Sequence, residues 1–115
     1  MKALKINSTE RTVVDIEIND WREIAPAIGN NCNTFECPII LDNNDSVYVD
    51  EEGLYHEIHG GFMINGFGHV IVGNGIVEGA DENGESCDVK TTKEELQSMI
   101  VWLDKDVCIK WTSKF

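Results

Sequence analysis

The sequence is poor in prolines, in basic residues and in long apolar runs. Two prolines and a hydrophobic fraction of 42% are typical of a folded protein rather than a disordered one. No run of about 18 apolar residues is present, so the sequence predicts no transmembrane helix. The opening segment MKALKINSTER has no apolar core of a secretion signal, and we therefore expect a cytoplasmic protein. The length of 115 residues predicts one domain over residues 1–115.

The sequence has few basic residues compared with its acidic ones. Nine Lys and Arg stand against 21 Asp and Glu, for a net charge of -12, and residues 23–89 hold 13 acids and no Lys or Arg. The sequence therefore argues strongly against direct binding of nucleic acid phosphates through a basic patch. Two interpretations remain: the charge keeps the protein soluble, or it forms a negative face for a basic partner.

Alternating apolar and polar residues predict several strands. The first covers residues 1–7, and the second covers residues 12–18 with Val14, Ile16 and Ile18 facing one way. Residues 34–41 and 45–50 predict two more strands joined by a turn. Asn83-Gly84 is a hairpin signal between residues 75–80 and 86–89.

Two helices are predicted. A short one starts after Asp20, with Glu23 completing a capping box, Trp21 facing inward and Gly29 ending it. The second spans Thr92 to Leu103 with one apolar stripe: Leu96, Met99, Ile100 and Leu103. Residues 106–111 return as a final strand. The expected fold is α+β, a mostly antiparallel sheet with both helices packed on one face.

Four segments carry a family resemblance: MKALKI, VYVDEEGL, GNGIVEGADENG and TTKEELQSMIVWL. Together they resemble a small acidic domain of phages and conjugative elements that has no assigned function. The resemblance covers about two-thirds of the chain and supplies no catalytic residues. It implies a setting in mobile elements, where small acidic proteins often blunt host defence.

The segment YHEIHGG raises the question of a metal site. His56 and His59 are three residues apart, whereas the zinc motif H-E-x-x-H has both histidines on one helical face four apart. Neighbouring glycines leave too few residues for a stable helix, and on a strand the two histidines would face opposite ways. The sequence therefore predicts a strand with exposed histidines and no metal or other cofactor. The alternative is a small metal- or nucleotide-binding protein, or a hydrolase, that uses His56, His59 and His69.

The cysteines, glycines and serines give no stronger motif. Without a secretion signal, the four cysteines are expected to be reduced thiols rather than disulfides, and Cys37, Cys87 and Cys108 are expected to be small buried hydrophobic residues. The C-x4-C pair of Cys32 and Cys37 lacks the second close pair of a structural zinc site. The glycine-rich region contains no G-x-G-x-x-G or G-K-[ST], and DNNDS and GADENGE lack the full spacing of a calcium loop. No serine lies in a nucleophile elbow, so no catalytic residue is assigned.

The charge distribution leads to the functional hypothesis. We expect a non-enzymatic acidic protein that presents a negative surface to the basic groove of a host nucleic-acid-handling or defence protein. Same-face residues on a strand recur about every 6.6–6.8 Å, about twice the charge spacing along a DNA strand, so the acids could mimic DNA. The expected binding residues are Asp50, Glu51, Glu52, Glu57, Asp81, Glu82 and Glu85.

Overall fold

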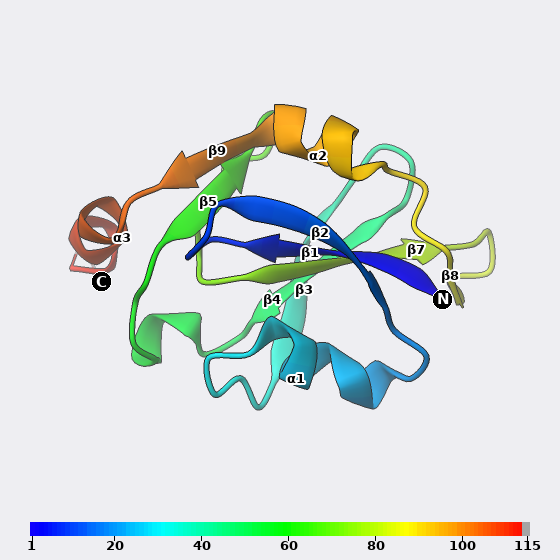
Figure 1. Cartoon of the computed structure of the whole chain (residues 1–115), viewed down its shortest axis with the longest axis horizontal. Helices are drawn as coiled ribbons and strands as arrows, with labels where there is room; N and C mark the ends of the chain where they lie inside the picture. Colours follow the sequence, from blue (N-terminus) through cyan, green and yellow to red (C-terminus); the bar gives the residue numbers. More distant parts are fainter. Residues whose placement is uncertain (114–115) are drawn as a thin grey trace.

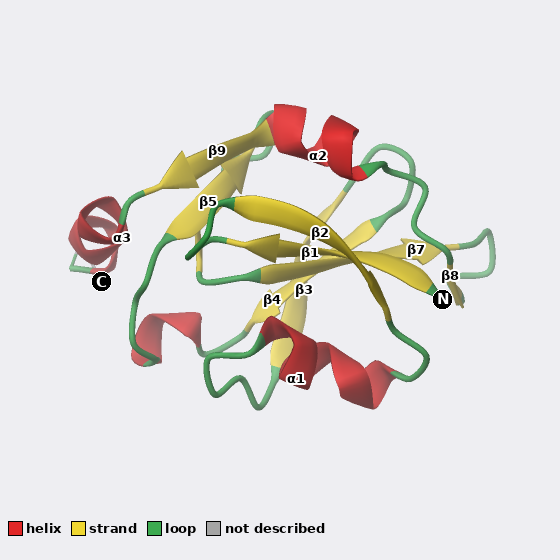
Figure 2. Ribbon diagram, in the orientation of Figure 1, coloured by secondary structure: helices red, strands yellow, loops and turns green. Residues whose placement is uncertain are grey.

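The computed structural model describes residues 1–113, which form two antiparallel sheets and three short α-helices (Figures 1 and 2). The strands are β1 (Lys2–Asn7), β2 (Thr12–Glu17), β3 (Phe35–Ile40), β4 (Ser46–Asp50), β5 (Gly61–Ile64), β6 (Ile71–Val72), β7 (Gly75–Ala80), β8 (Ser86–Cys87) and β9 (Ile100–Leu103). The helices are α1 (Ile24–Ile28), α2 (Lys93–Met99) and α3 (Lys105–Thr112), and two 3-10 turns are η1 (Trp21–Glu23) and η2 (Gly53–Tyr55).

The larger sheet has the order β2-β1-β7-β4-β3, with β8 paired to β7, and the smaller has the order β6-β5-β9. Every strand pair within the described residues is antiparallel. The predicted α+β class and antiparallel pairing are confirmed. The described residues form two sheets instead of one and three α-helices instead of two, and α1 and α2 cover opposite faces of the larger sheet rather than the same face.

Both faces of the larger sheet are covered, so two apolar cores form. One lies between the sheets and α2 and includes Leu4, Phe62 and Leu96. The other lies under α1 and includes Ile24, Ile28 and Ile76. The first five residues of β7, the central strand, are therefore all buried.

Coverage on both faces also corrects the prediction for β2. Val13 is buried in the first core, whereas Val14 is 41% exposed. Ile16 and Ile18 do pack in the second core, on the α1 side. The alternation is as predicted, but β2 is an edge strand of the sheet, and Val14 is exposed there.

The short helix begins with the predicted capping box, but one side chain, Trp21, is not where the sequence predicts it. The Asp20 side chain accepts a hydrogen bond from the Arg22 backbone N–H, and the Glu23 carboxylate reaches back to the Asp20 N–H. The Arg22 side chain also donates to Asp20, which lowers the pKa of this carboxyl to about 2. Trp21, expected inside, is 69% exposed.

The C-terminal third contains the largest errors of the sequence prediction. The helix expected over Thr92 to Leu103 ends at Met99, and Ile100–Leu103 is strand β9, paired with β5. The β-branched and aromatic residues of this segment favour a strand, and β5 offers Phe62 and Ile64 as neighbours. The strand expected over residues 106–111 is helix α3, because a short apolar run does not distinguish the two by periodicity alone.

Gly61 allows α3, β5 and β6 to approach one another. A Cβ atom at this position would lie 2.2 Å from the Ile71 carbonyl oxygen and 2.8 Å from the Cys108 sulfur.

Cys108 is fully buried, as predicted, but Cys37 is exposed and Cys87 is half-buried. All four cysteines are free thiols. In the described part of the chain, no helix is long and apolar enough to cross a membrane.

Candidate functional site: two acidic surfaces

The expected binding acids fall into two groups at opposite ends of β7. Glu51, Glu52 and Glu57, here called the η2 acids, follow β4 and flank η2, next to the start of β7. Asp81, Glu82 and Glu85, here called the hairpin acids, lie in the turn between β7 and β8, beyond its other end. Figure 1 shows η2, in green, and the β7–β8 hairpin at opposite ends of the long axis. The two groups therefore form two surfaces, not one.

Asp50 does not belong to either surface. Its side chain is only 4% exposed and lies 2.7 Å from His56 Nδ1. It also accepts a hydrogen bond from the Glu52 backbone N–H at 2.9 Å. These contacts fix the first residues of the turn after β4. Because the Asp50 side chain is buried, a partner cannot contact it directly and senses only its negative charge.

The six acids of the two groups are exposed, and none of them lies on a strand. The expectation of strand-spaced acids that match the phosphate spacing of DNA is therefore wrong for these residues. They occupy turns, where backbone hydrogen bonding sets the spacing. In the hairpin, for example, the Asp81 carboxylate accepts from the backbone N–H groups of Asn83 and Glu85.

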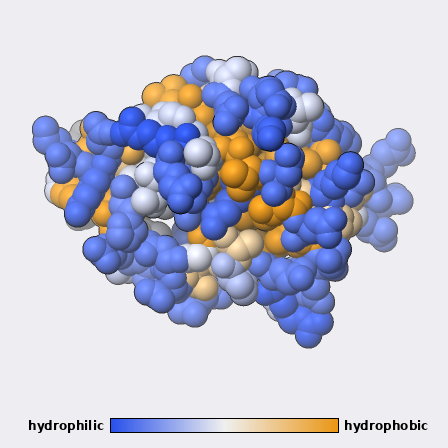
Figure 3. Space-filling view, in the orientation of Figure 1, coloured by the Kyte–Doolittle hydropathy of each residue, from blue (hydrophilic) through white to orange (hydrophobic). Residues whose placement is uncertain are grey.

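Within residues 1–113, four Lys and Arg side chains pair with acids outside these two groups. Arg11 contacts Asp104, Arg22 contacts Asp20, Lys90 contacts Asp45, and Lys93 contacts Asp15. Within residues 1–113, no Lys or Arg lies within ion-pair distance of the η2 acids or the hairpin acids. Both surfaces thus keep their negative charge available. Figure 3 shows that hydrophilic residues dominate one face of the molecule, with apolar residues exposed through its middle.

A hollow of about 170 Å³ adjoins the η2 acids. Its lining includes Glu36 on β3, Glu51, Leu54 on η2, Val70, Val72 on β6 and Trp111 on α3. The tertiary structure brings these residues together from four separate stretches of the chain. Sequence reasoning missed Glu36, because nothing in its local pattern distinguishes it from an ordinary solvent-facing strand residue.

The histidines do not assemble into one site. His56 contacts Asp50, His59 Nε2 lies 3.8 Å from a Glu57 oxygen, and His69 is exposed. The segment after η2 is irregular, so the predicted histidine strand is wrong. Within residues 1–113, no group of three or more His, Cys, Asp or Glu side chains could hold a metal ion.

Cys32 lies beside Asp50, which raises the question of a nucleophilic thiol. Burial raises the pKa of Cys32 to about 12, and the charges of Asp50 and Glu52 add to the effect. A thiol with this pKa is protonated at neutral pH, whereas a catalytic cysteine needs its thiolate form. The arrangement therefore disfavours nucleophilic chemistry at Cys32.

Concavities of nucleotide size in the described residues have acids in their lining, which disfavours a phosphate group. Pockets for small molecules measure about 300–1,000 Å³, and the acid-lined hollow is smaller. A concavity of about 410 Å³ includes Arg11, His59 and Lys105. However, Asp104 and Asp106 line the same concavity, and Arg11 is already paired with Asp104.

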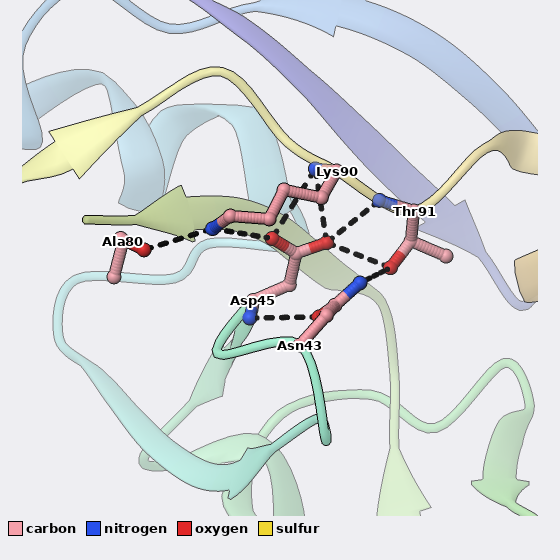
Figure 4. Close-up of polar contacts among 5 residues, drawn as sticks. All are labelled: Asn43, Asp45, Ala80, Lys90 and Thr91. Atoms are coloured by element: carbon pink, nitrogen blue, oxygen red, sulfur yellow. Dashed lines mark hydrogen bonds and ion pairs between the residues drawn. The ribbon is translucent and has the colours of Figure 1, made fainter. Parts of the chain in front are cut away.

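A second buried carboxylate, Asp45, has a purely architectural arrangement (Figure 4). It is fully buried and accepts hydrogen bonds from the backbone N–H groups of Lys90 and Thr91 and from the Thr91 hydroxyl. Asn43 completes the network by donating to the Thr91 hydroxyl. These contacts join the β3–β4 turn to the segment before α2. The sequence pattern places Asp45 where a predicted turn meets a predicted strand and does not indicate that its side chain is buried.

Comparisons with known proteins add no family or fold assignment: no family model, no curated protein and no solved structure matches this chain.

Proposed function

We propose that this chain is a non-enzymatic interaction protein whose η2 acids bind a basic surface of another protein. One observation carries the proposal: exposed carboxylates gather around η2 with no Lys or Arg within ion-pair distance in residues 1–113. A folded chain with a net charge of -12 attracts basic partners over a distance, so association is fast and depends on salt.

The η2 end is favoured over the hairpin end for a structural reason. The η2 acids adjoin a hollow with apolar walls, and interfaces gain most of their energy from groups buried in pockets. The hairpin acids surround a narrow turn, where Asp81 is already committed to backbone N–H groups. Charge alone on such a rim changes association rates more than affinity.

The class of partner follows from the charge and from the resemblance to mobile-element domains. Host proteins that handle nucleic acids, including defence proteins, carry basic grooves for phosphate backbones. A protein that occupies such a groove competes with the nucleic acid. We propose this anti-defence role for the chain, and it requires no catalytic residue or cofactor.

Affinity capture with three matched variants tests the proposal. Glu51→Lys with Glu57→Lys removes the η2 surface, Glu82→Lys with Glu85→Lys removes the hairpin surface, and Glu10→Lys with Glu94→Lys is the control. Each pair reverses two exposed acids, so the change in net charge is matched. We expect the wild type to retain a basic protein from a host lysate at low salt, and only the first variant to lose it. Equal losses in all three variants would indicate nonspecific attraction and refute the proposal.

A further inference from the structure

The hollow beside η2 has the size of one side chain. Its volume of about 170 Å³ is below the range of about 300–1,000 Å³ for small-molecule sites. It opens next to Glu51, one of the η2 acids. A group that projects from a docked protein could therefore enter it while the surrounding surfaces meet.

The walls divide into an apolar part and an acidic part. Leu54, Val70 and Val72 provide aliphatic surface, and Trp111 provides an aromatic wall. The carboxylates come from Glu36 and Glu51, which are both exposed, and from the buried Asp50. A long side chain with an apolar stem and a cationic end matches both parts, because Lys and Arg bury their methylene groups while the charge stays at a polar rim.

Arginine matches the hollow better than lysine. Its guanidinium group is planar and binds carboxylates with two parallel hydrogen bonds. It is also less strongly hydrated than an ammonium group, so it loses less when it leaves water. Asp50 is held by His56 and by the Glu52 N–H, so it contributes only its negative charge to the hollow. Glu36 and Glu51 remain to bind the cation.

We infer that the hollow accepts one arginine side chain of a basic protein partner, with its stem against the apolar walls and its guanidinium group between Glu36 and Glu51. This inference rests on the proposed function and names the group that the partner inserts. It also explains why the η2 end and not the hairpin end is the binding surface.

An NMR titration with short peptides tests the inference without a known partner. The probe is acetyl-Gly-Arg-Gly-amide, and the comparison peptides replace Arg by Lys or by citrulline, which is neutral and has nearly the same shape. We expect the arginine peptide to shift amide signals around Leu54 and Val72. The citrulline peptide should bind at least about tenfold more weakly, because it lacks the charge that strengthens hydrogen bonds to carboxylates.

Three variants locate the binding. Glu36→Gln with Glu51→Gln should weaken arginine binding about tenfold. The matched pair Glu82→Gln with Glu85→Gln should change it by less than about twofold, since distant exposed charges contribute little. Val70→Phe fills the hollow without changing the charge and should abolish binding. A thermal melt of each variant confirms that it is folded.

Several results would overturn the inference. Equal binding of the lysine and arginine peptides would mean that the hollow responds to charge alone. Equal effects of the two glutamine pairs would place the peptide elsewhere. If capture of a partner depends on the η2 acids but the arginine peptide does not bind, the inference fails and the proposed function stands. If the peptide binds in the hollow but no partner is captured, the proposed function fails instead.

Discussion

The two ends of strand β4 each carry a buried carboxylate, and the two have different surroundings. Asp45, just before the strand, has its oxygens occupied by backbone N–H groups and the Thr91 hydroxyl. Asp50, at the other end, pairs with His56 and faces a hollow beside exposed acids. Backbone donors that saturate a carboxylate indicate an architectural role. A carboxylate beside an open hollow and exposed acids without a Lys or Arg partner in residues 1–113 fits the binding surface that we propose.

The largest expected effect is the loss of Asp45. Asp45→Ala leaves the N–H groups of Lys90 and Thr91 without their acceptor, at about 1–3 kcal/mol for each buried group. We therefore expect the free energy of unfolding to fall by about 2–6 kcal/mol, measured by urea denaturation. Asp45→Asn retains one acceptor oxygen and should lose less. If Asp45→Ala lowered the free energy of unfolding by less than about 1 kcal/mol, the architectural role of Asp45 would be wrong.

The next effect concerns Cys32 at the Asp50 end. A pKa of about 12 instead of 9.0 lowers the thiolate fraction at pH 8 by about a thousandfold. The higher intrinsic nucleophilicity of such a thiolate offsets part of this. Alkylation by iodoacetamide should therefore be about 30-fold slower or more in the folded protein than after unfolding in urea. Mass spectrometry of the labelled peptides measures this, with the exposed Cys37 as internal control. Equally fast labelling of Cys32 in both states would contradict the assigned environment.

His56→Ala should have a smaller effect on stability than Asp45→Ala. The change leaves Asp50 with the Glu52 N–H and the Cys32 thiol as hydrogen-bond partners, and an underbonded buried acceptor costs about 1–3 kcal/mol. The adjoining hollow lets water reach the carboxylate, which favours the lower part of this range. Chemical denaturation of the two variants side by side provides the comparison. A greater loss for His56→Ala would make the Asp50 end the main structural anchor.

The exposed acids should have the smallest effect on stability and the largest on binding. Glu51→Gln with Glu57→Gln, and Glu82→Gln with Glu85→Gln, should each change the free energy of unfolding by less than about 0.5 kcal/mol, since surface charges contribute little. In the capture experiment only the first pair should weaken partner binding. A clear loss of stability in the first pair would mean that the η2 acids serve the fold.

Local signals in the sequence were sufficient where neighbours along the chain decide the structure. The capping box of Asp20 and Glu23 forms as predicted, and Asn83-Gly84 makes the turn between β7 and β8, with Gly84 at a φ of 80°. The antiparallel pairing of β3 and β4 across their short turn was also predictable. These features depend on caps, turns and alternation, which are written within a few residues.

Tertiary contacts decided the rest. Residues 100–103 have helical spacing of their apolar side chains, yet they pair with β5 because that edge supplies both hydrogen bonds and a core. The sequence showed many acids, but it could not show that Asp45 and Asp50 are buried, or that Glu36 and Trp111 line one hollow. Composition determined the negative charge of this protein. Only long-range packing determined which carboxylates are used inside the fold and which remain available to a partner, because burial depends on segments far apart in the chain.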